Sequence, residues 1–254
     1  MYDIIIVGAG MAGLTAAIYV RRAGKKVLVL ESKIYGGQII DSLSVENWPG
    51  NYKTSGTELM KKIYDQAKDL GAEIEYDVVK EIVDKGEYKK VIGEEEKYQA
   101  KAVILAMGTR PRKMSAKQTA DAGERSISYC ATCDGALYKD KPVVVVGSGN
   151  TAKYEIKYLE NIASKVYHIH HDDPIPSDVA AVFVAIGRVP NTKFLKDFVK
   201  LDKNGYVVAG EDCETSREGV YVAGDCRTKG VRQLVTAAGD GAVAAEAAIS
   251  YLNR

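Results

Sequence analysis

The chain carries the same pattern of strand, glycine-rich turn and helix twice, and this repeat restricts the folds that it can adopt. Residues 3–7 (DIIIV) are an apolar run that meets the turn GAGMAG at 8–13, and residues 141–146 (KPVVVV) meet GSGNTA at 147–152. Each turn leads into a stretch with helical periodicity. A buried strand that passes through such a turn into a helix is typical of a Rossmann-like unit. We therefore predict an α/β fold with two Rossmann-like domains.

The two copies differ in length. From Gly8 to Gly108, which ends ILAMG, there are 100 positions (108 − 8), but only 40 (187 − 147) separate Gly147 from Gly187, which ends VAIG. The first copy has room for a β-meander over 72–106, whereas the second passes from the strand SKVYHIHH almost directly to VAAVFVAIG. We therefore predict a complete first nucleotide site and a much reduced second domain.

The order of the remaining patterns predicts a discontinuous layout. Pro111 lies among charged residues and indicates a boundary. After Gly205 we expect a strand (YVVA), a second strand (VYVAGD) and an Ala-rich helix over 233–252 that rejoin the first unit. The predicted domains are 1–112 with 212–254, and an inserted domain over 113–211. A helix is also predicted over 53–70, beginning near Thr54 or Ser55.

The charge balance excludes several classes of function. Lys and Arg (35) and Asp and Glu (34) nearly cancel, which leaves a formal charge of +1. No global field therefore favours nucleic acid or an anionic membrane. The apolar run before Gly8 is too short for a signal peptide or a membrane span, so we expect a cytoplasmic protein.

The first glycine turn is expected to bind a dinucleotide. Gly8, Gly10 and Gly13 permit a tight turn, close approach to a pyrophosphate, and close packing of helix on strand. Glu31 ends the second strand, 23 residues after Gly8, where its carboxylate can accept hydrogen bonds from the ribose hydroxyls. Asp225, after Gly224, is placed to bind the linker of an extended dinucleotide, although by itself it reads more readily as a helix cap.

Two cysteines between the copies indicate redox chemistry. Cys130 and Cys133 are separated by two residues, and Asp134 follows the second thiol. Such a pair can form a small disulfide ring and exchange through a thiolate. The alternative, half of a zinc site, would need further ligands from Cys213, Cys226 or the histidines at 168–171, so we expect no metal. Cys213 and Cys226 are expected to be buried thiols.

The second glycine turn keeps its form, but the strand that should read the ribose ends in His170-His171-Asp172-Asp173. A 2′-phosphate at that place requires arginine rather than acids. NADPH is thus disfavoured by charge, and either nicotinamide cofactor by the missing chain. The retained glycines are then expected to serve the packing of helix on strand.

Taken together, these motifs resemble those of the low-molecular-weight thioredoxin reductases over nearly the whole chain. The segments that carry the resemblance are GAGMAG with Glu31, Gly36-Gly37-Gln38, ENWPG at 46–50, AMGTRPR at 106–112, CATCDG at 130–135, YVAGDC at 221–226 and RQLVTAAGDG at 232–241. The resemblance implies a flavoprotein with two dinucleotide-binding domains, in which the first holds FAD and the second, here much reduced, carries the CxxC. It also implies a homodimer whose partner is thioredoxin.

The resemblance further implies roles for individual residues. Cys133 would face the flavin, Cys130 would attack the disulfide of the partner, and Asp134 would be the acid–base group. The expected cofactor-binding residues are Gly8, Gly10, Gly13, Glu31, Gly36, Gly37, Gln38, Asn47, Gly108, Gly224, Asp225, Arg232, Gln233, Leu234 and Ala237.

The departures from this family lie in the second domain, and they resemble the ferredoxin-dependent flavin thioredoxin reductases. The main hypothesis is therefore that reduced ferredoxin delivers electrons to FAD, which reduces the Cys130–Cys133 disulfide, and that Cys130 then reduces thioredoxin. The basic stretch Arg110–Lys113 is a candidate docking surface for ferredoxin. Three alternatives stay open: an NADPH-dependent enzyme with a shortened domain, an oxygen-using dithiol oxidase, and a non-catalytic redox-sensing flavoprotein.

Overall fold

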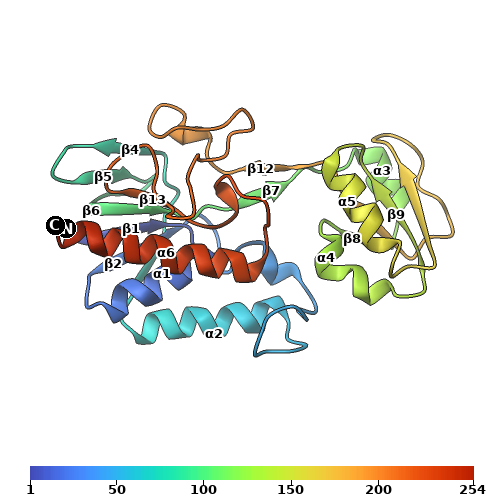
Figure 1. The fold of residues 1–254 in the computed structure, drawn as a ribbon, viewed down its shortest axis with the longest axis horizontal. Helices are drawn as coiled ribbons and strands as arrows, with labels where there is room; N and C mark the ends of the chain where they lie inside the picture. Colours follow the sequence, from blue (N-terminus) through green and yellow to red (C-terminus); the bar gives the residue numbers. More distant parts are fainter. The chain divides into compact units, whose positions relative to one another are not determined.

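A computed structural model describes all residues from 1 to 254 and divides them into two compact units (Figure 1). Unit 1 comprises Met1–Thr109 and Pro190–Arg254, and unit 2 comprises Arg110–Val189. The chain leaves unit 1 along β7 (Thr109–Pro111) and returns along β12 (Arg188–Pro190), and these two strands pair with each other. An inserted unit was expected from the sequence.

Unit 1 is built on a seven-stranded sheet. Its path is β3 (Glu73–Tyr76), β2 (Val27–Glu31), β1 (Tyr2–Val7), β6 (Lys97–Leu105), β5 (Lys89–Ile92) and β4 (Glu81–Asp84), with β13 (Val220–Val222) also paired to β6. The pairs among β3, β2, β1, β6 and β13 are parallel, whereas β4, β5 and β6 form the antiparallel meander expected over 72–106. The parallel strands place their carboxyl ends at one edge, where ligands bind in such sheets.

Three helices cover one face of this sheet: α1 (Met11–Arg22), α2 (Gly56–Asp69) and α6 (Leu234–Leu252) (Figure 1). Ile4 and Ile6 of β1 point into the core under these helices, while Ile5 and Val7 point into the core of the opposite face. Alternate side chains of β1 are therefore buried on both faces, as in a sheet covered on both sides. Helix α2 begins where the sequence indicated, with Ser55 as its N-cap in a capping box with Glu58.

Residues that pack on the opposite face of the sheet show that the second domain boundary differs from the expected one. Leu195, at the end of the short helix η3 (Lys193–Leu195), and the nearby Val199 and Val207 are buried in the core that contains β6 and β13. Residues 190–211 thus pack with unit 1, so the chain returns near residue 190 rather than near 212. The predicted strand YVVA is also wrong: Val207 makes only isolated bridges, to Leu201 and Arg227.

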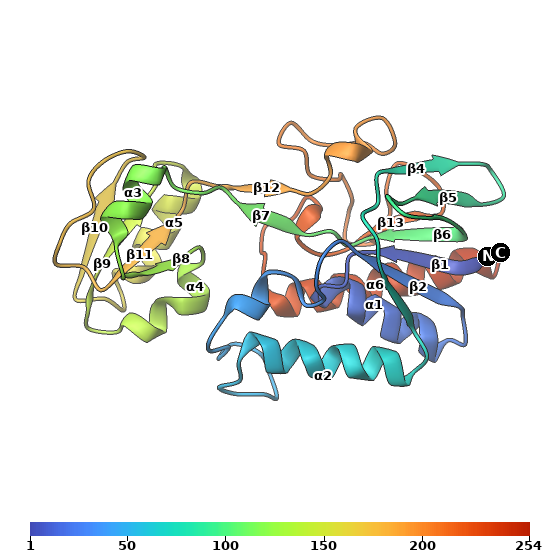
Figure 2. The ribbon, with the colours of Figure 1, turned by 180° about the vertical axis from the view of Figure 1, so that it is seen from behind.

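Unit 2 holds a four-stranded parallel sheet in the order β10 (Lys165–Ile169), β9 (Pro142–Val146), β11 (Ala181–Val184) and β8 (Ser126–Ser128) (Figure 2). Its helices are α3 (Ala116–Ala122), α4 (Ala131–Asp134), continued by the 3₁₀ turn η2 (Gly135–Tyr138), and α5 (Asn150–Leu159). Val143 and Val145 of β9 share a core with Ala131 and Ala152, whereas Val144 and Val146 face a second core with Ala122. Unit 2 is therefore a small Rossmann-like domain without a meander, which confirms the predicted fold class.

None of the helices combines the length and the apolar character that crossing a membrane requires.

Candidate functional site

The first glycine turn is shaped for close approach to a ligand. Gly8 has φ of +108°, and a Cβ on Gly13 would lie only 1.8 Å from the carbonyl oxygen of Gly8. Gly10 is the N-cap of α1, which has no side-chain cap and no acid in its first turn, and a Cβ on Gly10 would meet nothing within 4 Å. The amino end of α1 thus presents its backbone N–H groups to open space, which is the arrangement that binds a pyrophosphate.

Glu31 stands beside this turn at the end of β2. One carboxylate oxygen accepts a hydrogen bond from the Ala9 N–H at 2.8 Å, and the other accepts from the N–H groups of Ser32 at 2.7 Å and Lys33 at 3.1 Å. These bonds fix the carboxylate next to the turn, where the sequence predicted it. Its contact with a ribose stays a prediction.

Gly36 and Gly37 form the second wall of the same cradle. The Gly36 N–H donates to the Ala9 carbonyl at 2.8 Å, and Gly36 forms a bridge to Gly10. Both glycines have positive φ, and a Cβ on Gly37 would come within 3.6 Å of the Gly10 Cα. Next in the chain, the Gln38 amide donates to the carbonyl of Thr109.

The remaining predicted cofactor residues of unit 1 converge on the same cradle. Gly224 has φ of +78°, and a Cβ there would lie 2.9 Å from the Ala12 Cβ and 3.8 Å from the Ala237 Cβ. Gln233, the N-cap of α6, accepts a hydrogen bond from the Asn47 amide at 3.1 Å, and Leu234 begins that helix. These contacts join the segments around 10, 47, 224 and 233 at the amino ends of α1 and α6.

Arg232 and Gly108 complete the predicted set. The Arg232 guanidinium donates to the Asp225 carbonyl at 3.2 Å and lies over the ring of Tyr206, 4.3 Å from its centre. Gly108 has φ of +62°, and a Cβ there would meet nothing within 4 Å. The cradle therefore fits an extended dinucleotide: positive-φ glycines line it, and the amino end of α1 supplies the phosphate donors.

Asp240, in the middle of α6, supports this cradle, and the sequence reasoning did not single it out. Its carboxylate accepts from Arg227 Nε at 2.9 Å, Lys229 Nζ at 2.7 Å and the Gly224 N–H at 3.0 Å. Burial disfavours the charged carboxylate, but the hydrogen bonds and charges of Arg227 and Lys229 outweigh burial and lower its pKa. An acid within an Ala-rich apolar helix was the available signal, because a buried charge requires partners.

The two redox cysteines form a disulfide in unit 2. Cys130 and Cys133 have Cα atoms 5.3 Å apart, and Cys130 is the N-cap of α4. Ser128, which the sequence did not indicate, donates to the Asp134 carboxylate at 2.6 Å and accepts from the Cys130 N–H at 3.1 Å. Asp134 is thus linked through one hydroxyl to the backbone of Cys130.

The other two cysteines lie in unit 1. Cys213 and Cys226 are fully buried, and burial raises the pKa of their thiols to about 11 and about 12. A buried thiol with a raised pKa is a poor nucleophile, as expected for a packing residue. No group of three His, Cys, Asp or Glu side chains lies close enough together to hold a metal ion.

The second glycine turn repeats the geometry of the first. A Cβ on Gly147 would lie 2.5 Å from the Ala185 oxygen, the same distance as that between a Cβ on Gly8 and the Ala106 oxygen. The Gly147 N–H donates to the Ile169 carbonyl at 3.0 Å, as that of Gly8 does to Leu30 at 2.7 Å. Since Ile169 corresponds to Leu30, His170 occupies the place that Glu31 holds in unit 1.

Acids follow His170 directly. The Asp173 carboxylate accepts from the His170 N–H at 2.8 Å, and the Asp172 carboxylate lies 3.0 Å from His171 Nδ1. His171 and Ser115 lower the pKa of Asp172, with a smaller contribution from Lys117. The edge of unit 2 that would read a ribose therefore carries carboxylates.

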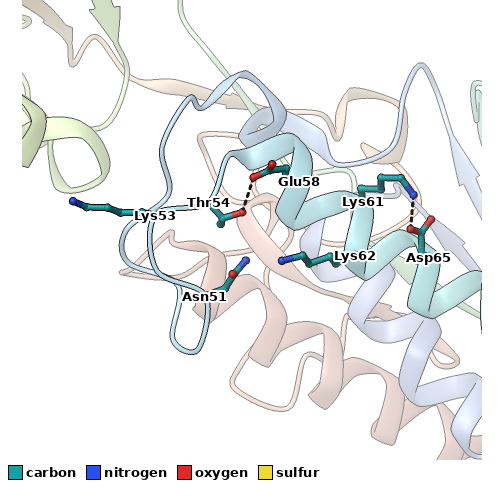
Figure 3. A pocket seen from close by; sticks show the side chains of 7 residues that line it. All are labelled: Asn51, Lys53, Thr54, Glu58, Lys61, Lys62 and Asp65. Atoms are coloured by element: carbon teal, nitrogen blue, oxygen red, sulfur yellow. Dashed lines mark hydrogen bonds and ion pairs between the residues drawn. The ribbon is translucent and has the colours of Figure 1, made fainter.

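A surface hollow of about 470 Å³ on unit 1 takes no part in this site. Its lining comes from the loop before α2 and from the first turns of that helix: Asn51, Lys53, Thr54, Glu58, Lys61, Lys62 and Asp65 (Figure 3). Glu58 caps α2 and accepts from Thr54 at 3.3 Å, Lys61 pairs with Asp65 at 2.5 Å, and Lys53 points away from the others. None of these residues belongs to the cradle or to the disulfide.

Comparison with known proteins identifies the family. The model of the pyridine nucleotide-disulphide oxidoreductases matches residues 2–177 and 172–241. The thioredoxin reductase of Bacillus subtilis is 35% identical over 300 residues, which covers 99% of this chain and 95% of that protein. Among solved structures, thioredoxin reductase from Streptococcus pyogenes matches with a TM-score of 0.92 at 31% identity, covering 100% of this chain and 98% of that one. A ferredoxin-flavin thioredoxin reductase from Clostridium acetobutylicum matches with a TM-score of 0.65 at 28% identity, covering 99% and 97%.

Proposed function

Because this chain belongs to the pyridine nucleotide-disulphide oxidoreductase family and is a thioredoxin reductase, we propose that its electrons come from reduced ferredoxin rather than from NADPH. The observation that carries the proposal is the acidic edge of unit 2. Asp172 and Asp173 follow the position that corresponds to Glu31, where a 2′-phosphate would have to bind. Two carboxylates repel a phosphate and offer it no hydrogen-bond donor.

The length of the chain supports the same proposal. The match to the Bacillus protein extends over 300 residues, whereas this chain has 254, so at least 46 positions (300 − 254) have no counterpart here. The second copy of the repeat is the short one, and its sheet has four strands and no meander. A smaller unit 2 offers less surface for the nicotinamide half of a dinucleotide.

The flavin site of the proposal is the cradle of unit 1. Thioredoxin reductases of this family bind FAD, and the cradle formed by Gly10, Gly37 and Gly224 is its site. Bound there, FAD supplies the conversion of single electrons into pairs that a one-electron donor requires. The residues of unit 2 would then do the thiol chemistry: Cys133 receives the pair, and Cys130 attacks the disulfide of thioredoxin. Asp134, linked to Cys130 through Ser128, would hold the proton that this exchange moves.

Partners and assembly form part of the same proposal. Arg110, Arg112 and Lys113 are exposed and offer positive charge to an acidic ferredoxin. The homodimer that the family resemblance implied is retained and is tested by light scattering of the holoenzyme. A location in the cytoplasm is retained from the sequence and is tested by cell fractionation.

One observation favours a second candidate, an NADPH-dependent thioredoxin reductase with a shortened domain. The turn at Gly147 keeps the geometry of the turn at Gly8, and α5 has Gly149 as its N-cap, with no side-chain cap and no acid in its first turn. This end of α5 can still accept a pyrophosphate. The two candidates therefore differ in the ribose end of the site rather than in the phosphate turn.

The discriminating experiment is an anaerobic turnover assay. Thioredoxin reduction is followed with reduced ferredoxin, NADPH or NADH as the only electron source, and with Cys130→Ser as the control for electron flow that bypasses the disulfide. We expect turnover with ferredoxin and none above the control with either nicotinamide. Turnover with NADPH at micromolar concentration contradicts the proposal and selects the second candidate.

A further inference from the structure

A second carboxyl group besides that of Asp134 lies against the redox loop. Glu155, in the middle of α5, is only 7% exposed. Its carboxylate accepts a hydrogen bond from the backbone N–H of Ala131, the residue directly after Cys130. Ala131 itself is fully buried in the core between α5 and the sheet of unit 2.

The hydrogen bonds of this carboxyl group satisfy only one of its two oxygens. Glu155 Oε2 is buried and has no hydrogen-bond partner. Asp134, by contrast, receives the hydroxyl of Ser128 at 2.6 Å. A buried carboxylate oxygen without a donor is costly, whereas a protonated carboxyl group avoids the cost of the charge. A structural role alone would be served as well by a glutamine, whose amide oxygen can accept from Ala131.

The electrostatic surroundings place the protonation of Glu155 near neutrality. Burial raises the pKa of the Glu155 carboxyl to about 7, against the opposing effects of the Ala131 N–H and the charge of Arg188. Strand β9, on which α5 packs, has no titratable side chain. The other titratable groups on elements next to α5 are Asp134 on α4, Tyr138 on η2, and Lys165, Tyr167 and His168 on β10. Of these, Lys165 and Tyr167 bind each other, and His168 binds the Gly147 carbonyl.

We propose that Glu155 is a positioning residue for the dithiol that takes up one of the two protons of disulfide reduction. The step balances as follows: the disulfide, the Glu155 carboxylate, two electrons and two protons give one thiol, one thiolate and the Glu155 carboxylic acid. The S–S bond breaks, the electron pair reaches the sulfurs, one proton joins a sulfur and the other joins Glu155. The electrons are those of the established activity, so the proposal holds for either donor.

Repulsion between two negative charges explains why Glu155 takes up a proton when the disulfide is reduced. A carboxylate held on the Ala131 N–H, which is buried, and a thiolate on the half-buried Cys130 next to it would be two like charges close together, and each raises the pKa of the other. Protonation of Glu155 allows the thiolate to form without adding a negative charge around the loop. The buried carboxyl group thus couples the reactivity of the dithiol to the supply of protons.

The test uses the holoenzyme and the isosteric variant Glu155→Gln, with the exposed Glu160→Gln at the end of the same helix as its control. The dithiol:disulfide ratio is measured by thiol alkylation in redox buffers of fixed potential, between about pH 7.5 and 8.5. In wild type and Glu160→Gln, the ratio should fall close to tenfold more per pH unit than in Glu155→Gln, which corresponds to about 30 mV for this two-electron couple. Equal slopes in all three proteins overturn the proposal.

A second measurement is made on the wild-type protein and so does not depend on the folding of a variant. Reduced-minus-oxidised infrared difference spectra of the wild-type holoenzyme at about pH 8 should show a new band of a protonated carboxylic acid. Absence of that band from the wild type refutes proton uptake by a carboxyl group. A band that persists in Glu155→Gln assigns the proton to Asp134 instead, and it overturns the proposal as well.

Discussion

Replacement of Asp240 by asparagine tests how α6 holds the cofactor cradle. Asp240 lies on α6 with its side chain only 9% exposed, and its two cationic partners, Arg227 and Lys229, are 11% and 6% exposed. Asparagine keeps the shape and one acceptor oxygen for the Gly224 N–H, but it leaves two buried cations without a counter-charge. Removing one member of a buried ion pair costs about 3 to 5 kcal/mol, so we expect a loss of that size in the stability of unit 1.

The pH dependence of the stability provides a second test of this prediction. Because the folded-state pKa of Asp240 lies below its unfolded value, its stabilisation is fully present above about pH 4 and is lost as the pH falls through the folded-state pKa. The difference between wild type and Asp240→Asn should therefore be constant from about pH 6 to 8 and shrink only in acid.

The assay is equilibrium unfolding in urea, followed by the release of flavin fluorescence and by circular dichroism. The matched control is Glu246→Gln, which removes an exposed charge from the same helix and should change stability by less than about 0.5 kcal/mol. A loss below about 1 kcal/mol for Asp240→Asn, with flavin affinity unchanged, refutes the reasoning that a buried charge network holds Gly224 in place.

Three further predictions concern single residues. Gly13→Ala places a Cβ 1.8 Å from the Gly8 oxygen, so FAD affinity should fall at least about tenfold, measured by flavin release on dilution; full occupancy would contradict the fit of the cradle. Cys130→Ser should abolish thioredoxin reduction while the flavin stays reducible. Cys226→Ser, at a fully buried thiol, should keep turnover and lose about 1 to 3 kcal/mol of stability. The reverse outcome would show that the reactive thiol lies in unit 1. Because the folded-state pKa of Glu155 is raised to about 7, the free energy of unfolding of wild type should fall by up to about 3 kcal/mol as the pH rises from about 4.5 to 7. Glu155→Gln should therefore give a flatter profile of melting temperature against pH. Parallel profiles of the two proteins would contradict that pKa.

Local signals in the sequence predicted local structure well. The glycine turns at 8–13 and 147–152 lead into α1 and α5, and Ser55 with Glu58 caps α2, because each of these features lies within six consecutive residues. The expectation of a strand over YVVA failed for the opposite reason. Val207 is buried by packing against distant parts of unit 1, and no neighbouring strand offers it a continuous ladder.

The contacts of the supporting residues could not be predicted from sequence patterns. Ser128, Asp240 and Glu155 act through partners that the fold brings to them: Asp134 across α4, Gly224 across 16 residues, and Ala131 from another helix. Periodicity and motif spacing carry no information on such contacts. The domain boundary near residue 190 likewise depends on tertiary contacts, because it follows from where Leu195 and Val199 are buried.

Stopped-flow bleaching of the enzyme-bound flavin under anaerobic conditions distinguishes ferredoxin from a nicotinamide as the electron donor. Oxidised holoenzyme is mixed with reduced ferredoxin, NADPH or NADH, and the fall in flavin absorbance is recorded. We expect fast bleaching by reduced ferredoxin and no bleaching by either nicotinamide on the time scale of turnover. Fast bleaching by NADPH at micromolar concentration would show that unit 2 still accepts a nicotinamide dinucleotide despite Asp172 and Asp173, and it would rule out ferredoxin as the required donor.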